Sequence, residues 1–184
     1  MAVLDVVHGK LPFVVFLFLG EVVFGKGLLQ KFLGYGFYTG KKGFALRVHA
    51  KSKAKMKARV RELTSRKTVN DYEKWKVDLK RYVVGWVNYY KLADMGTYLQ
   101  SIDEWMRRRI RMVFWKKWKR VRTRWRNLSK LGISNRNARL LACSRKGYWR
   151  IAASPIMKTA LSNLRIEKAG FQFFYSYFRK SVAA

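Results

Sequence analysis

The pattern of apolar and polar positions begins with a stretch that predicts a β-hairpin. In residues 31–49, aromatic and branched side chains lie on both sides of a glycine-containing turn at residues 39–43. Glycine readily adopts the positive φ angles that tight turns need, so this arrangement is typical of two antiparallel strands. From residue 51 the apolar positions recur at helical spacing instead, which predicts a mainly α fold, a helical bundle preceded by the short hairpin.

The first predicted helix follows the hairpin and ends near Arg66, with Ser52 as a candidate cap. Met56, Val60 and Leu63 recur at spacings of four and three, so they form one narrow apolar seam that must pack against a neighbour. Burial of this seam leaves two parallel rows of cations facing outwards. These rows are Lys53, Lys57 and Arg61 on one flank and Lys51, Lys55 and Arg59 on the other.

A second helix is predicted over residues 71–91, where six apolar positions fall on one stripe. Aromatic residues at this spacing are more typical of a packed core than of a cofactor site. Gly85 lies in the same stretch although glycine costs a helix up to about 1 kcal/mol, which suggests a close approach to another helix. The stripe consists of Tyr72, Trp75, Leu79, Val83, Trp86 and Tyr90.

The stretch from Tyr98 to about Leu128 combines helical periodicity with the highest density of positive charge. Lys117 and Arg124 fall within its apolar face, so the helix is expected to kink or end before Leu128. That face contains Ile102, Met106, Ile110, Val113, Val121 and Leu128. Residues 107–126 contain no acidic residue, and their cations are Arg107, Arg108, Arg109, Arg111, Lys116, Lys117, Lys119, Arg120, Arg122, Arg124 and Arg126.

Periodicity is weaker in the C-terminal segment, residues 129–184. Two short helices are predicted, over residues 135–144 and 154–168, the second with Pro155 in its first turn. The aromatic cluster at residues 171–178 is expected to pack this segment onto the helical domain of residues 51–128.

Charge narrows the possible partners. Lys and Arg total 41 against 10 Asp and Glu, which gives a formal net charge of +31, and a folded protein this basic favours a polyanionic partner. With 49% hydrophobic and 16% aromatic residues, the chain is too apolar to be a disordered basic tail. Nucleic acid and an anionic membrane surface are therefore the partners to compare, and a solvated surface without a specific partner is the third alternative.

The N-terminal residues 1–30 form a separate apolar segment. The run at residues 11–19 is about half as long as the roughly 20 residues that a spanning helix needs, and no small-x-small cleavage site follows it. A buried strand, or a segment belonging to a missing partner, is favoured over targeting or membrane insertion.

Cys143 is the only cysteine, which excludes an intrachain disulfide, suits a reducing cytoplasm and suggests a small buried side chain.

Interleaved tryptophans favour nucleic acid over a membrane. A helical wheel places Trp115 opposite the apolar face, between Arg111 and Lys119, whereas a membrane-surface helix carries tryptophan on its apolar face. An exposed tryptophan can stack on an unpaired base, which favours RNA over DNA. Trp115 is thus a candidate stacking residue, unless the C-terminal segment, for example residues 171–178, folds over this face and buries it.

The residues needed for catalysis are few. Asp103 and Glu104 are the only adjacent carboxylates, and neighbours on a helix point about 100° apart, so they are poor joint ligands for a metal ion. Asp103 is instead expected to pair with a neighbouring arginine. No phosphate-binding glycine loop and no nucleophile with a matching base are present. We therefore predict neither catalytic residues nor metal ligands, no cofactor and no small-molecule substrate.

Several blocks, taken in order, resemble the C-terminal part of group II intron reverse transcriptase/maturases. The first, KFLGYGFY at residues 31–38, is similar to the end of the polymerase region. The next three resemble the thumb and the maturase-specific domain, also called domain X: KMKARVRELTSR (55–66), DLKRYVVGWVNYYKLAD (78–94) and LQSIDEWMRRRIRMVFWKKWKR (99–120). The last, SRKGYWRIAASPIMKTALSNLRIEKAGF (144–171), is similar to the closing segment of bacterial members that lack an endonuclease domain.

The resemblance implies that the chain binds group II intron RNA and assists its folding and splicing. In family terms, Gly85, Trp86, Tyr89 and Tyr90 are packing positions, and Asp103 with Trp105 opens the next helix. The intron-facing residues would be Lys51, Lys53, Lys55, Lys57, Arg59, Arg61, Arg66, Lys67, Arg107, Arg108, Arg109, Arg111, Trp115, Lys116, Lys119, Arg120, Arg122 and Arg126.

The family's polymerase palm, with its Tyr-Ala-Asp-Asp metal site, should lie upstream of residue 31, but only the unrelated residues 1–30 are found there. We therefore expect a truncated maturase that retains RNA binding, lacks polymerase activity by itself and is located in a bacterial cytoplasm. The alternatives are an accessory C-terminal part of a split reverse transcriptase, whose partner would be a separate polymerase half, and a basic membrane-surface protein.

Overall fold

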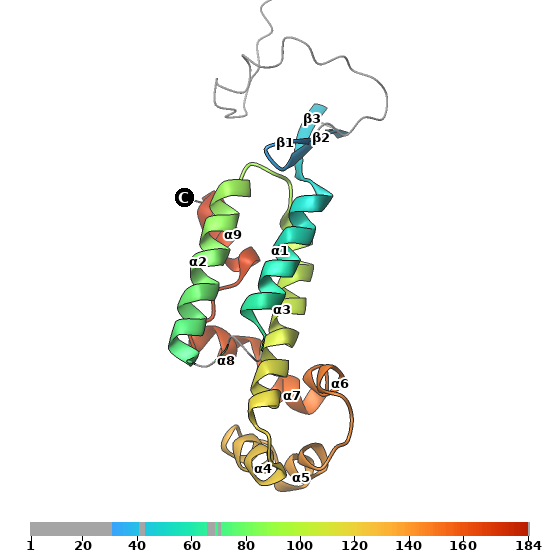
Figure 1. The fold of residues 1–184 in the computed structure, drawn as a ribbon, viewed down its shortest axis with the longest axis vertical. Coiled ribbons are helices and arrows are strands. Elements are labelled where there is room, and N and C mark those ends of the chain that lie inside the picture. Colours follow the sequence, from blue (N-terminus) through green and yellow to red (C-terminus); the bar gives the residue numbers. More distant parts are fainter. Residues whose placement is uncertain (1–30, 41–42, 66–68, 70, 184) are drawn as a thin grey trace, which may run out of the picture. The chain divides into compact units, whose positions relative to one another are not determined.

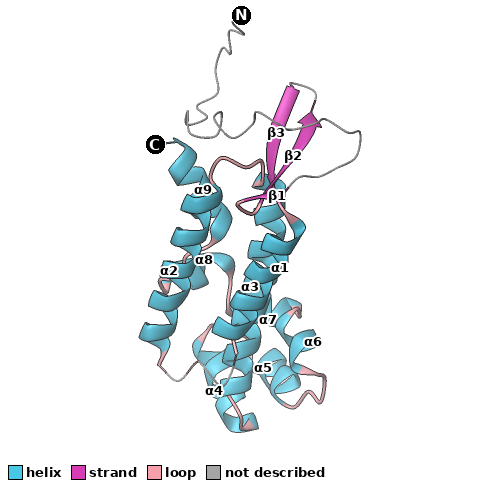
Figure 2. Cartoon of the chain, turned by 45° about the horizontal axis from the view of Figure 1, so that its top comes forward, coloured by secondary structure: helices cyan, strands magenta, loops and turns pink. Residues whose placement is uncertain are grey.

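The computed structural model describes residues 31–40, 43–65, 69 and 71–183, which belong to one compact unit. The predicted hairpin is confirmed. Strand β2 (Tyr35–Gly40) pairs antiparallel with β3 (Gly43–Val48), and the two-residue strand β1 (Lys31–Phe32) pairs with the other edge of β2 (Figure 2). The register places Tyr35 opposite Val48, whose buried side chain joins the helical core.

Helices make up most of the described chain, so the predicted mainly α fold is confirmed. Figure 1 shows the long helices α1, α2 and α3 side by side, with α9 against α2 and α3, and with α4 to α7 gathered at the end of α3 that is remote from the hairpin. Their bounds are α1 Ala50–Leu63, α2 Tyr72–Tyr90, α3 Gly96–Lys117, α4 Val121–Lys130, α5 Asn135–Ala142, α6 Tyr148–Ala152, α7 Pro155–Ala160, α8 Asn163–Lys168 and α9 Phe174–Ala183.

Helix α1 buries the predicted apolar seam. Met56 and Val60 are fully buried, and Leu63 packs at the margin of the core. Ser52 is not the cap: the Nδ1 atom of His49 accepts the backbone N–H of Lys51 at 3.2 Å. The buried Ser52 hydroxyl instead donates to the carbonyl of Gly34 at 3.1 Å and so ties α1 to the hairpin.

Helix α2 begins after Asp71, whose carboxylate accepts the backbone N–H of Glu73 at 2.9 Å. Its predicted stripe is buried except for Tyr72, which is 40% exposed. The expectation about Gly85 is wrong. A Cβ atom there would meet nothing within 4 Å, because Gly85 lies on the exposed face of the helix and not at a helix contact.

The basic stretch breaks into two helices, as predicted. α3 ends at Lys117, and α4 carries the fully buried Leu128. Arg124 lies at the junction, where its Nε–H donates to the carbonyl of Trp118 at 2.9 Å. Arg124 is one of the two cations, with Lys117, whose positions within the apolar face predicted the break.

The C-terminal segment contains more and shorter helices than the periodicity predicted. The expected helix over residues 154–168 is two helices, α7 and α8, and the hydroxyls of Ser154 and Ser162 cap them by accepting backbone N–H groups at 3.3 Å. The aromatic cluster does pack onto the body, with Phe173 and Phe174 fully buried. Cys143 is exposed, contrary to expectation, because it follows the last turn of α5.

The apolar run at residues 11–19 lies outside the described residues. Among the helices that the structure describes, none is both long and apolar enough to cross a membrane.

Candidate nucleic-acid interface

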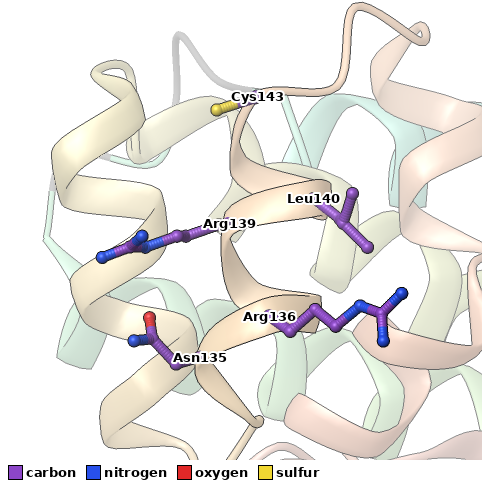
Figure 3. Close-up of a pocket in the computed structure, with 5 residues that line it drawn as sticks. All are labelled: Asn135, Arg136, Arg139, Leu140 and Cys143. Atoms are coloured by element: carbon purple, nitrogen blue, oxygen red, sulfur yellow. The ribbon is translucent and has the colours of Figure 1, made fainter.

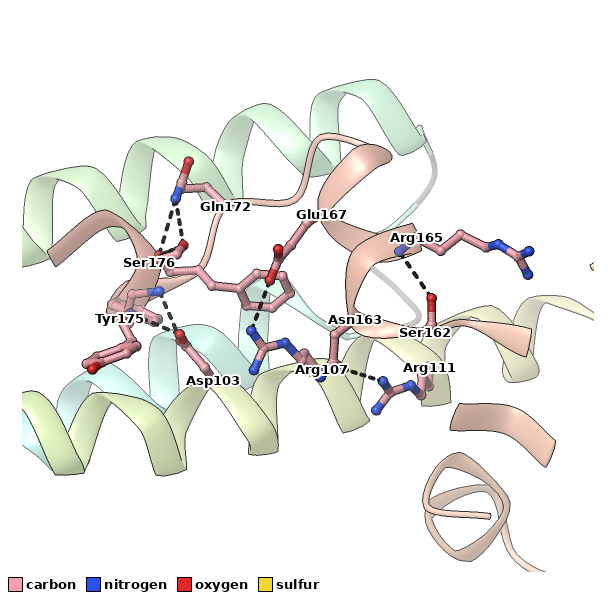
Figure 4. A network of polar contacts seen from close by, with 12 residues as sticks. Asp103, Arg107, Arg111, Ser162, Asn163, Arg165, Glu167, Gln172, Tyr175 and Ser176 are labelled. Atoms are coloured by element: carbon pink, nitrogen blue, oxygen red, sulfur yellow. Dashed lines mark hydrogen bonds and ion pairs between the residues drawn. The ribbon is translucent and has the colours of Figure 1, made fainter. Parts of the chain in front are cut away.

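The buried guanidinium of Arg111 lies on the face of α3 that was predicted to contact RNA. Arg111 is 5% exposed. Its Nε–H donates to the carbonyl of Leu161 at 2.9 Å, and Nη2 donates to Oδ1 of Asn163 at 2.8 Å (Figure 4). Burial lowers the pKa of Arg111, and nearby Arg107 lowers it further. The assignment of Arg111 to the RNA surface is therefore corrected, since this cation binds the protein's own C-terminal segment.

Trp115 is buried as well. It is only 1% exposed, with the Arg124 guanidinium 4.7 Å from its ring centroid and the Trp118 ring at 6.3 Å. Of the two alternatives predicted for Trp115, the solvent-facing stacking residue is wrong and the buried side chain is confirmed. A helical wheel of α3 alone cannot show that residues 148–163 return over this face.

Three further arginines of α3 are engaged inside the protein. Arg107 pairs with Glu167 at 3.0 Å, and its guanidinium lies 4.4 Å from the centroid of the Phe173 ring. Arg108 donates twice to a single backbone carbonyl, that of Trp149, at 3.0 and 3.2 Å. Arg109 bonds to the C-terminal end of α1. It donates to the Thr64 hydroxyl at 2.6 Å and to the Arg61 carbonyl at 3.1 Å. These contacts give the arginines a structural role that charge density alone did not reveal.

Asp103 caps helix α9 instead of pairing with an arginine, which corrects the expectation from the sequence. Its two carboxylate oxygens each accept a backbone N–H, from Phe174 and from Tyr175, at 2.9 Å (Figure 4). Burial raises the pKa of Asp103 to about 6, although the two N–H donors and Arg107 act in the opposite direction. The carboxylate thus joins the middle of α3 to the start of α9.

The exposed cations of the interface come mainly from the part of the chain beyond α3. Lys119, Arg120, Arg122 and Arg126 are exposed as predicted, whereas Lys116 is half-buried with its Nζ atom 5.2 Å from the Tyr148 ring centroid. Further exposed cations, which were not among the predicted RNA-binding residues, follow in residues 130–150. These are Lys130, Arg136, Arg139, Arg145, Lys146 and Arg150.

A composition signal could have found these residues, because no Asp or Glu occurs between Glu104 and Glu167. Helices α4 to α7 and α8 as far as Ile166 therefore contain no carboxylate side chain to neutralise the exposed cations. Such a surface concentrates anions around itself.

The cations of α1 have a more mixed environment. Lys51 and Lys55 are exposed. Lys53 and Lys57 are half-buried, and the Lys53 ammonium lies 4.4 Å from the Tyr98 ring centroid, with its pKa lowered chiefly by burial. Two arginines have neighbours of their own, since Arg59 pairs with Glu62 at 2.6 Å and Arg61 lies 5.7 Å from the Trp105 ring centroid. Arg66 and Lys67 lie outside the described residues.

A shallow hollow lies on α5, lined by Asn135, Arg136, Arg139, Leu140 and Cys143 (Figure 3). The indole N–H of Trp125 in α4 donates to Asn135 Oδ1 at 2.8 Å and fixes the two helices together at its edge. With two arginines and no carboxylate, the lining suits an anionic ligand. No group of His, Cys, Asp or Glu among the described residues could hold a metal ion.

The fold and the exposed charge define a mainly helical, strongly basic protein with a carboxylate-free helical cluster at one end of α3. Residues 53–132 match the family model of the group II intron maturase-specific domain. This match confirms the resemblance to the C-terminal part of a group II intron maturase and supports a maturase-type function. It runs from the first turn of α1 to just beyond α4. No match was found among curated proteins.

Proposed function

We propose that the chain binds group II intron RNA through the exposed cations of α4 to α6 and assists the folding and splicing of that RNA. The carboxylate-free stretch at residues 105–166 carries the proposal, together with the family match. Each exposed Lys or Arg that contacts a phosphate releases condensed counterions, and no neighbouring carboxylate in this stretch competes for the cation.

Salt dependence of binding tests the proposal. If six to ten phosphates are contacted, affinity for group II intron RNA should fall by roughly 10³- to 10⁵-fold between 50 and 200 mM salt. Filter binding at a series of salt concentrations measures this slope. A flat response would contradict the proposal, since it would mean that cations do not form the interface.

Paired charge variants locate the interface. Arg122→Gln combined with Arg126→Gln removes two exposed cations from α4, and should reduce the slope of log K against log salt by about 2. Lys74→Gln combined with Lys80→Gln removes the same charge from exposed positions of α2, near Glu73 and Asp78, and should leave the slope nearly unchanged. Equal effects of the two pairs would indicate attraction by net charge alone.

Splicing assistance needs its own measurement. Group II intron RNA is incubated at a magnesium concentration too low for efficient self-splicing, with and without the protein. We expect spliced product to accumulate faster with the wild-type protein than with the α4 double variant. Binding without any gain in splicing would restrict the function to RNA binding.

The second candidate function is that of an accessory part of a split reverse transcriptase. The observation that favours it is the hairpin at residues 31–48, where the sequence resembles the end of a polymerase region. Metal ions supply the main charge stabilisation in phosphoryl transfer. The described residues contain no group of His, Cys, Asp or Glu that could hold such ions. In primer extension on an RNA template with Mg²⁺ or Mn²⁺, the chain alone should therefore give no product. Extension by the chain alone, in a preparation free of host polymerases, would contradict this.

A further inference from the structure

Two adjacent aromatic side chains on α6 remain exposed within the carboxylate-free stretch. Tyr148 is 46% and Trp149 is 37% exposed, although the last two residues of the same helix, Ile151 and Ala152, are buried. Helix α6 packs on α3 and is seen at the outer edge of the α4–α7 cluster in Figure 1. The buried residues fix α6 in place, so the exposed rings belong to an anchored helix.

Cations from α3 hold both rings. The Arg108 guanidinium lies 4.0 Å from the centroid of the Trp149 ring, and the Lys116 ammonium lies 5.2 Å from that of Tyr148. Arg108 also donates two hydrogen bonds to the backbone carbonyl of Trp149, so α6 stays attached to α3 independently of the indole ring. A ring that is held by a cation and partly open to solvent is a suitable surface for stacking of a planar group.

The surroundings select an anionic ligand with planar groups. Arg145 and Lys146 precede the two rings and Arg150 follows them, and all three are exposed. A membrane surface would require aliphatic side chains beside the aromatic ones, but the aliphatic residues of α6 point into the core. Unpaired nucleotides combine a base that stacks on an aromatic ring with a phosphate that contacts Lys or Arg.

We propose that Trp149, with Tyr148 beside it, stacks on unpaired bases of the bound RNA, while Arg145, Lys146 and Arg150 contact the flanking phosphates. The inference rests on the proposed RNA-binding function and adds a preference for single-stranded segments. It assigns to α6 the stacking role that the buried Trp115 cannot have.

The test compares Trp149→Leu with Trp149→Phe. Leucine removes the aromatic ring and phenylalanine retains one, and the backbone bonds from Arg108 remain in both variants. For an RNA with an unpaired loop, Trp149→Leu should lower affinity by at least roughly fivefold, and Trp149→Phe by much less. For a fully paired RNA of the same length, both should bind like the wild type. Tyr72→Leu, which removes a comparably exposed ring beside Asp71 and Glu73 on α2, is the matched control and should change neither affinity.

The outcomes separate the two proposals. Suppose that the α4 double variant loses affinity for both RNAs while Trp149→Leu binds like the wild type. This result would overturn the stacking inference and leave the proposed RNA binding intact. A wild-type protein that binds neither RNA would overturn both. Equal losses in the leucine and phenylalanine variants would also overturn stacking. The stacking inference would also be overturned if Trp149→Leu floated less with phosphatidylserine vesicles but kept its RNA affinity. The rings would then bind a membrane surface.

Discussion

Residues 107–111 and 119–126 are close in sequence and both rich in cations. The four cations of the first group bond to other segments of the protein, whereas every cation of the second group except Arg124 is exposed. Arg107, Arg108, Arg109 and Arg111 each donate to an oxygen atom of another segment, three of them to backbone carbonyls. Arg122 and Arg126 are exposed. Since the side-chain chemistry is the same, the difference comes from whether the fold brings acceptor oxygens to the position.

A run of arginines can therefore be structural as well as a binding surface for RNA. A guanidinium has five N–H donors in a planar arrangement, so it can satisfy several carbonyls at a junction between helices as well as it can bind phosphate. The carbonyls that bind the α3 arginines lie at or near the ends of other helices, such as Leu161 after α7 and Arg61 near the end of α1. Charge density therefore identifies cations, and only the fold separates structural ones from those available to RNA.

Replacing Trp115 should give the largest effect. Trp115→Ala leaves a cavity in the core and should destabilise the fold by about 3–5 kcal/mol. Chemical denaturation measures this loss. At a temperature where the variant is still folded, RNA affinity should match the wild type. Weakened binding by a fully folded variant would break the division between the inward-facing and solvent-facing groups.

Titration of Asp103 should give the next largest effect. Because folding raises its pKa from the ordinary 3.8 to about 6, the folded state binds a proton more tightly than the unfolded chain. Stability from this group is therefore full below pH 3.8, falls as pH rises to about 6, and is constant above that. Over this window the wild type should lose about 2–3 kcal/mol relative to Asp103→Asn, in denaturation experiments at pH 4 to 7. Parallel pH profiles would contradict the raised pKa.

Arg111 gives the most direct test of the comparison. Arg111→Met keeps the length of the side chain but leaves the buried carbonyl of Leu161 without its donor, which should cost about 2 kcal/mol of stability. Arg122→Met, at an exposed position of α4, should change stability by less than about 0.5 kcal/mol but weaken RNA binding. If Arg111→Met were harmless and Arg122→Met destabilising, the assignments of the two groups would have to be exchanged.

The smallest effect is expected at α1. Lys51→Gln combined with Lys55→Gln removes two exposed cations from a helix whose exposed face also bears Glu62, so RNA affinity should fall by only about threefold. The measurement is filter binding in parallel with the Arg122 and Arg126 double variant. A larger loss at α1 would move the centre of the interface towards the hairpin.

The elements of the fold could be predicted well because each depends on local sequence. The hairpin, the helix over residues 71–91 and the break before Leu128 follow from turn residues and periodicity, which neighbouring residues determine. The family resemblance was equally accessible, since it rests on blocks of sequence, and the match at residues 53–132 confirms it.

The environment of individual side chains could not be predicted in the same way. Asp103 and Arg111 bond to residues at least 50 positions away, and Trp115 is buried with its ring under Arg124 of the following helix. The periodicity of one helix contains no information about such contacts. The exposed cations could have been identified from amino-acid composition instead. The absence of carboxylates from residues 105–166 marks the exposed cations of α4 to α6 without reference to the fold.

The return of the C-terminal segment onto α3 has a consequence for synthesis of the chain. As the ribosome releases α3, the acceptors for Arg108 and Arg111 and the donors for Asp103 have not yet been made, because they lie at residues 149–175. The segment that matches the maturase-specific domain ends at residue 132, before all of them. The nascent helix therefore carries uncompensated cations that can attract RNA before the fold is complete, and a chain cut at residue 132 would remain in that state.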